Sequence, residues 1–258
     1  NTAVGTEALG ANTTGASNTA VGKGALTANT NGTQNQAFGH KALESVTSGY
    51  GNVAMGYGTL KTITGANENV GIGSNALEAN TASANTAVGY SALQANSSGS
   101  NLVAVGSNAL VANTNAPHNT AVGGSSLAAN TTGYANTAIG GESGRSNTTG
   151  NEGTFLGKRA GYKATTGTSN TLVGINCGYE ITTGGANTAI GKGAGGLITT
   201  GENNVCLGLN AGAVTTGSNQ LYIARSPANQ GNNPVWIYGD GSGNVIQGNN
   251  STSWSQAS

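Results

Sequence analysis

Few residues in this chain could carry out acid–base or metal chemistry. Asp240 is its only aspartate, and the other acidic residues are glutamates scattered along the sequence. Cleavage of a polysaccharide needs two carboxyl groups on either side of the bond, and only Glu142 and Glu152, which flank an irregular stretch, suggest such a pair. His40 and His118 stand alone, and no HExxH, CxxC or P-loop motif occurs. We therefore expect no enzyme, no cofactor and no metal site.

Composition and charge exclude several kinds of partner. The net charge is zero, charged residues make up 7% of the chain, and no basic run is present that could bind nucleic acid or anionic lipid. No apolar stretch approaches the ~18 residues that span a membrane, so membrane insertion is not expected. Glycine accounts for 45 of 258 residues without recurring at every third position, which excludes collagen.

A repeat organises the sequence, and any functional residue is positioned by it. The pentapeptide NTAVG of residues 1–5 returns throughout the chain, and its closing glycine recurs at steps of 17 residues, with a single step of 16. A fixed period held over so many copies is typical of a solenoid. The closing glycines are Gly5, Gly22, Gly39, Gly56, Gly73, Gly89, Gly106, Gly123, Gly140, Gly157, Gly174, Gly191 and Gly208.

The first element of each copy has two distinct sides. Numbering the repeat from one at Asn1, position four is apolar in every copy, as in Val21, and position three is mostly small, as in Ala20. Successive side chains of a strand point to opposite faces. We expect the position-four side chains to form the core. The small position-three side chains would then form the opposite face, where another backbone can approach closely.

A second apolar element follows in each copy. Position eight is mostly Ala, and position nine is Leu as far as Leu127 and Gly from Gly144 onward. Corners rich in Asn and Gly, such as residues 11–15, supply turns. One copy therefore predicts a strand, a tight turn, a short strand and a turn. Glycine and asparagine in every copy, and apolar residues without helical spacing, argue against helices.

These patterns predict an all-β fold, a β-solenoid or β-roll of about thirteen coils with a 17-residue period. From residue 141 on, position nine is no longer leucine, and larger side chains such as Tyr162 and Ile181 come later in the copy. This change predicts two sub-types of coil, residues 1–140 and 141–218. We expect this change to alter the cross-section and to leave the fold unchanged.

Residues 219–258 lose the period and form a third predicted segment. They hold both tryptophans, alternating stretches typical of strands, and a hairpin signal at Asp240 and Gly241. We expect a small β cap on the last coil. The stretch 240–244 is also loosely like a cation-binding loop, although a turn is the better interpretation.

The two cysteines are expected to be structural. Cys177 stands at position eight and Cys206 at position three, two coils apart. Stacked strands are ~4.8 Å apart, so the two backbones should be too distant for a disulfide. We expect each cysteine to replace a small alanine.

The interior of one chain would be thin, because only positions four and nine carry bulky residues in most copies. An isolated roll of this composition would be marginally stable for its size. We expect several copies, three in all, to pack in parallel with the small position-three faces toward a common axis. The alternative is that these faces meet solvent.

The sequence also resembles a known group of fibrous proteins. The NTAxG…AL…NTTG repeats of residues 1–224, followed by LYIA…P…IYGD within residues 219–246, resemble the repeat shafts of bacteriophage tail fibres. The repeats are similar, too, to the β-roll heads of trimeric autotransporter adhesins, in which the repeat is shorter. The resemblance implies an extracellular, homotrimeric segment of a virion tail fibre that presents a surface to a polysaccharide or protein receptor on the host cell.

The end of the chain extends this resemblance. In such fibres the terminal β segment is often followed by an intramolecular chaperone of the endosialidase type, which trimerises the fibre and then cuts itself off after a serine. The last residues, WSQAS, resemble those before such a cut, which implies that Ser258 is a processed C-terminus. The Asp and basic motif expected after the cut is missing, and the alternative is an arbitrary boundary at Ser258.

Receptor contacts are expected from aromatic residues at the corners and at the aperiodic end, because aromatics suit sugar and protein recognition. The alternative for each is packing over a neighbouring coil. Three other functions stay open: a bacterial surface adhesin, an ice-binding solenoid that uses threonines at position two or at positions thirteen and fourteen, and a polysaccharide depolymerase tailspike. The candidate contacts are Tyr50, Tyr57, Tyr90, Tyr134, Trp236, Tyr238 and Trp254.

Overall fold

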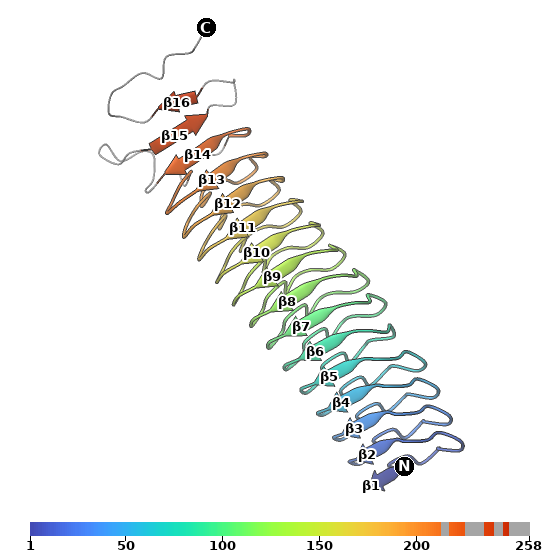
Figure 1. Ribbon diagram of the computed structural model, residues 1–258. Coiled ribbons are helices and arrows are strands. Elements are labelled where there is room, and N and C mark those ends of the chain that lie inside the picture. Colours follow the sequence, from blue (N-terminus) through green and yellow to red (C-terminus); the bar gives the residue numbers. More distant parts are fainter. Residues whose placement is uncertain (213–216, 225–234, 240–244, 248–258) are drawn as a thin grey trace. The chain divides into compact units, whose positions relative to one another are not determined.

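The computed structural model describes residues 1–212, 217–224, 235–239 and 245–247, and within them it contains strands and turns but no helix. The chain forms two compact units, Asn1–Ala135 and Asn136–Ser258. The repeat forms a parallel β-solenoid of about thirteen turns with a 17-residue period, as predicted (Figure 1). The three segments predicted from the sequence, with boundaries at residues 140 and 218, stay a prediction.

In the first unit each coil contributes one short strand. Successive strands pair in parallel and in register, so that Thr2 lies opposite Thr19 and Ala3 opposite Ala20. The same register continues from β2 to β8. The strands are β1 (Thr2–Val4), β2 (Thr19–Val21), β3 (Gln36–Phe38), β4 (Val53–Met55), β5 (Val70–Ile72), β6 (Thr86–Val88), β7 (Val103–Val105) and β8 (Thr120–Val122).

The second unit begins in the same way and ends differently. Its first six strands pair in parallel, and the last two pairings, of β14 with β15 and of β15 with β16, are antiparallel. The antiparallel strands come after the period has ended. The strands are β9 (Thr137–Ile139), β10 (Thr154–Leu156), β11 (Thr171–Val173), β12 (Thr188–Ile190), β13 (Val205–Leu207), β14 (Leu221–Ala224), β15 (Val235–Gly239) and β16 (Val245–Gln247).

The predicted orientation of the strands is wrong. Position three forms the core, since Ala20, Ala37 and Ala54 are fully buried, whereas position four faces outward, with Met55 48% exposed and Ile72 36% exposed. The reason is the narrow interior. Leucines at position nine, such as Leu26, and alanines at position eight, such as Ala25, are fully buried in the same coils. An alanine facing that leucine fills the space, and a valine or methionine would overfill it.

The predicted second strand is also wrong, because residues 23–28 and their counterparts form consecutive turns. Leu26 has a φ of 51° and Leu43 a φ of 52°, in the left-handed region that strands exclude. Their backbone groups still bind other coils: the Leu26 N–H donates to Ala42 O at 3.1 Å. A left-handed leucine costs about 1–2 kcal/mol, which burial of its side chain, worth about 1.5–3 kcal/mol, offsets.

The second unit removes that strain and fills its core differently. Position nine is Gly161 in the coil of β10, with a φ of 59°, and the ring of Phe155, at position three, occupies the space of the missing leucine. A Cβ on Gly161 would lie 2.6 Å from Cε1 of Phe155. Ile181 and Ile198, at position twelve, are fully buried as well. Of the larger side chains that come later in these copies, Ile181 and Ile198 therefore enter the core, whereas Leu197 is 49% exposed.

Buried asparagines form two hydrogen-bonded rows in the core, at positions one and twelve. The corner asparagines were expected to supply turns, and burial of neither row was predicted. At position twelve, Asn113 Nδ2 donates to Asn96 Oδ1 at 2.9 Å and to the Ala116 carbonyl at 3.2 Å. At position one, Asn52 Nδ2 donates to Asn35 Oδ1 at 3.0 Å. These buried amides therefore bind both the neighbouring coil and a carbonyl of their own coil, as from Asn52 Nδ2 to Ala66 O at 2.9 Å.

The position-twelve row is interrupted where an apolar residue replaces asparagine. Asn29 is fully buried and its Nδ2 donates to Asn12 Oδ1 at 2.8 Å. The next coil has Val46 at this position, and Asn29 Oδ1 has no hydrogen-bond partner. The row therefore stops on an unsatisfied acceptor, which is the expected consequence of removing one partner from a chain of amide bonds.

Candidate functional site

The outer face of the strands in the first unit is an exposed apolar surface without charge. Positions two and four of β1–β8 hold only Thr, Gln, Val, Phe, Met and Ile. Among them Met55, Ile72 and Val103 are exposed, and most of the others are half-buried. We call this surface the strand face. Contiguous exposed apolar surfaces of this kind commonly mark sites of interaction with another protein.

The second unit carries the same strand face on β9–β13. Ile139 is 43% exposed and Ile190 is 45% exposed, and no residue at positions two or four of these strands is charged. Position two, one of the positions expected to contribute threonines to an ice-binding surface, holds half-buried threonines in β9–β12, namely Thr137, Thr154, Thr171 and Thr188. The position-thirteen hydroxyls donate within the chain, as from Thr13 Oγ1 to Thr30 O at 3.0 Å.

The four predicted tyrosine contacts are exposed but are not gathered in one place. Tyr57 and Tyr90 are at position six, beside the end of the strand, and are 57% and 58% exposed. Tyr50 and Tyr134 are at position sixteen, in a corner, and are 44% and 45% exposed. Tyr57 also stacks on His40, with ring centroids 5.3 Å apart. The structure thus separates these candidates into two rows.

The remaining predicted contacts fall where less is described. Trp236 and Tyr238 belong to β15, in which Tyr238 pairs with Tyr222 of β14, but their side chains lie outside the described residues. Trp254 and Ser258 also lie outside the described residues. The sequence predictions for these four residues are therefore untested.

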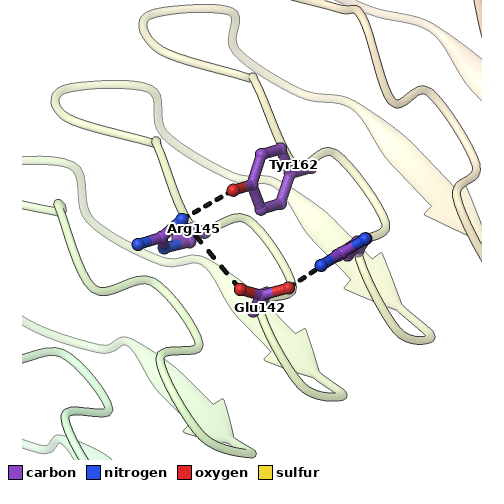
Figure 2. A network of polar contacts seen from close by, with 4 residues as sticks. Glu142, Arg145 and Tyr162 are labelled. Carbon is purple, nitrogen blue, oxygen red and sulfur yellow. Dashed lines mark hydrogen bonds and ion pairs between the residues drawn. The ribbon is translucent and has the colours of Figure 1, made fainter.

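A cluster of charged and aromatic side chains in the second unit was not predicted from the sequence. Figure 2 shows Arg145 between Glu142 and Tyr162: its Nη1 donates to Tyr162 Oη at 2.6 Å and lies 4.0 Å from Glu142 Oε1. The other oxygen of Glu142, Oε2, accepts a hydrogen bond from Arg159 Nε at 2.6 Å. Two guanidinium groups therefore share one carboxylate.

Stacked rings hold the cations of this cluster in place. Tyr162 and Tyr179 lie parallel, with centroids 5.0 Å apart and an angle of 4° between the rings. The guanidinium carbons of Arg145 and Arg159 each lie 5.6 Å from the Tyr162 centroid. These distances are within the range of cation–π attraction. We call Glu142, Arg145, Arg159, Tyr162, Lys163, Tyr179 and Glu180 the basic–aromatic cluster.

The second ion pair of the cluster lies at its other end. Lys163 Nζ donates to both oxygens of Glu180, at 2.9 and 2.7 Å, and lies 5.6 Å from the Tyr179 centroid. The hydrogen bond to Glu180 raises the pKa of Lys163. The hydrogen bond from Arg159 lowers the pKa of Glu142, and the same bond raises the pKa of Arg159. Glu142, Arg159 and Lys163 are therefore charged at neutral pH.

Charge is concentrated around this cluster. Four of the nine lysines and arginines of the chain, Arg145, Lys158, Arg159 and Lys163, fall within residues 145–163. Lys158 is exposed. The repeat contained the signal for the stacking, because Arg145, Tyr162 and Tyr179 all occupy position ten and in-register coils place equal positions one above another.

The two carboxylates suggested as a catalytic pair bind different partners. Glu142 binds the two arginines described above, whereas Glu152 accepts a hydrogen bond from Ser169 Oγ at 3.2 Å. Within the residues that the structure describes, no three His, Cys, Asp or Glu side chains come together as a metal site. In the same part of the chain there is no helix long and apolar enough to cross a membrane.

The cysteines behave as the sequence predicted. Cys177 and Cys206 are free and fully buried, in places where most coils have alanine. Burial raises the pKa of each thiol to about 12. Both are therefore uncharged at neutral pH and poor nucleophiles.

No protein-family model, curated protein or solved structure matches the chain. The interpretation of these surfaces accordingly depends on their own geometry and chemistry.

Proposed function

We propose that this chain is a structural and adhesive segment of a fibre, in which parallel copies pack side by side and present a receptor-binding surface. The observation that supports the proposal is the strand face: an apolar row, free of charge, along every strand from β1 to β13. The position-three alanines, which were expected to form the contacts between copies, are instead buried in the core of the chain itself.

A second copy of the same chain is a suitable partner for the strand face. Equal positions recur at the spacing of stacked strands, ~4.8 Å. Parallel copies in register would therefore place each coil against the identical coil of the other copy. Burying the exposed half of one Val, Ile or Met is worth about 1 kcal/mol, and association costs about 4–15 kcal/mol in lost freedom. The four exposed apolar side chains of the first unit, Val4, Met55, Ile72 and Val103, together reach the lower end of that range, whereas one or two coils do not.

The number of copies and the setting of the fibre follow from the resemblance of the repeats. It favours three parallel copies in an extracellular bacteriophage tail fibre, with the segment around β14–β16 as a cap and a polysaccharide or protein of the host surface as receptor. The exposed tyrosines at positions six and sixteen, such as Tyr90 and Tyr134, are available for such contacts. A bacterial surface adhesin would use the same strand face.

A pair of lysines on the strand face tests the proposal. We expect Met55→Lys with Ile72→Lys to convert the assembly to monomers, because charges buried between copies would be desolvated. Asn115→Lys, at an exposed corner, adds a similar charge and should leave the assembly intact. Sedimentation velocity at equal concentrations measures both. Assembly that survives the two strand-face lysines would refute the strand face as the contact.

A further inference from the structure

The basic–aromatic cluster has features of a binding site that the fibre alone does not explain. Its side chains project from the turns after the strands, at positions seven, ten and eleven, rather than from the strand face. Arg145, Arg159 and Lys163 keep 46%, 42% and 45% of their side chains exposed although each has a carboxylate partner. The cluster is therefore ordered and accessible at the same time.

Its cations retain capacity for another anion. Arg159 uses only Nε in the hydrogen bond to Glu142, and Arg145 uses only Nη1 in its contacts with Tyr162 and Glu142. Each guanidinium has five N–H donors, so both keep terminal nitrogens that no bond within the described residues engages. A carboxylate fits two parallel guanidinium donors, which makes arginine the preferred residue for that group.

The rings reduce the cost of recognition. Contact with Tyr162, which itself stacks on Tyr179, limits the positions that the side chains of Arg145 and Arg159 can adopt. Ordering a long side chain on binding opposes affinity, and a side chain that is already held avoids most of that penalty.

The arrangement favours a linear polymer as ligand. The cations come from two neighbouring coils, Arg145 from one and Lys158, Arg159 and Lys163 from the next, so they span one coil step of ~4.8 Å along the stack. A chain with regularly spaced anionic groups can contact several at once and gains affinity from the linkage. Nucleic acid is less favoured, because its affinity depends on many phosphate contacts with a strongly basic surface, and here Glu142 and Glu180 lie among only four cations.

We propose that the basic–aromatic cluster binds a carboxylated polysaccharide of the uronic acid type, with Arg145 and Arg159 pairing with sugar carboxylates and the two stacked tyrosines supporting them. This proposal rests on the adhesive function and names the class of its receptor.

Calorimetric titration with oligogalacturonate tests the proposal, with its neutral methyl ester and an oligothymidylate as matched ligands. We expect the acid form to bind about tenfold or more tightly than the ester, and the double variant Arg145→Gln with Arg159→Gln to bind it about tenfold or more weakly than the natural chain. Lys61→Gln is the control, since Lys61 is a cation at position ten without an aromatic stack, and it should change the affinity less than about twofold.

Glu142→Gln separates binding from a merely structural role. It removes the anion that competes with the ligand, so we expect affinity to rise about fivefold, whereas loss of a structural network would lower it. Equal binding of acid and ester, preference for the oligothymidylate, or unchanged binding by the arginine double variant would each overturn the proposal. If the chain then still assembles through the strand face, the fibre function stands and only the ligand class fails.

Discussion

Removing one asparagine from the buried row at position twelve should destabilise the solenoid far more than removing an exposed one from the same corner. Asn113 is fully buried and makes two donated bonds, to Asn96 Oδ1 and to the Ala116 carbonyl. Its own Oδ1 accepts a hydrogen bond from Asn130 Nδ2 at 3.0 Å. Asn115, two residues later, is exposed and provides the control.

The magnitude follows from the groups that lose their partner. Asn113→Ala leaves Asn96 Oδ1 and the Ala116 carbonyl buried without the bond that satisfies them. Position one of that coil is Leu102, which cannot donate to Ala116 as asparagines do to the equivalent carbonyl elsewhere, for example Asn85 Nδ2 to Gly99 O at 2.9 Å. Each of these two unsatisfied groups costs about 1–3 kcal/mol, so we expect a loss of about 2–6 kcal/mol in the free energy of unfolding.

Equilibrium unfolding in urea, followed by circular dichroism, gives the comparison. Asn115→Ala should stay within about 0.5 kcal/mol of the natural chain. Because coils of a solenoid can unfold separately, hydrogen exchange at the amides of residues 96–130 should show the loss locally. If Asn113→Ala is no more destabilising than Asn115→Ala, the buried rows do not stabilise the core as argued.

Two further predictions follow from the glycines and the cysteines. Gly106→Ala places a Cβ 2.6 Å from the carbonyl group of the next coil at a φ of 135°. This substitution should lower the free energy of unfolding by about 3 kcal/mol or more. Gly124→Ala, whose Cβ would have its nearest atom at 4.0 Å, should be neutral, and equal urea midpoints for the two variants would contradict this. Burial raises the pKa of Cys177 and Cys206 from 9.0 to about 12, so between these values the unfolded chain binds fewer protons and stability falls as pH rises, by about 1 kcal/mol per pH unit for each thiol. Urea unfolding at about pH 8 and about pH 10.5 should show a steeper loss for the natural chain than for Cys177→Ala with Cys206→Ala, and equal losses would show that the thiols do not contribute.

The repeat predicted the class of fold because a period read from the sequence becomes stacking in space. The repeat did not show which face of the strand is buried and which is exposed. Alternation separates Ala20 from Val21 but assigns neither to the core, and hydrophobicity alone favours the larger residue. The interior is so narrow that Leu26 and a facing alanine fill it, and the left-handed backbone of that leucine is not visible in a pattern of residue types.

The candidate sites were predictable to different degrees. Exposure of Tyr57 and Tyr90 follows from their place beside a turn. The basic–aromatic cluster was present in the sequence as residues 17 apart, Arg145, Tyr162 and Tyr179, but opposite charges and rings at equal positions are recognised as one network only when the coils are known to stack in register. The buried asparagines lacked any such signal, since asparagine is common in turns.

The mass of the assembled chain in solution tests the central proposal most directly. One chain has a mass of 25.0 kDa, and sedimentation equilibrium at micromolar concentration should give three times that value, with no dependence on concentration until high dilution. A single species at the mass of one chain would contradict the account, because the strand face would then be a surface that the chain exposes without a partner of its own kind.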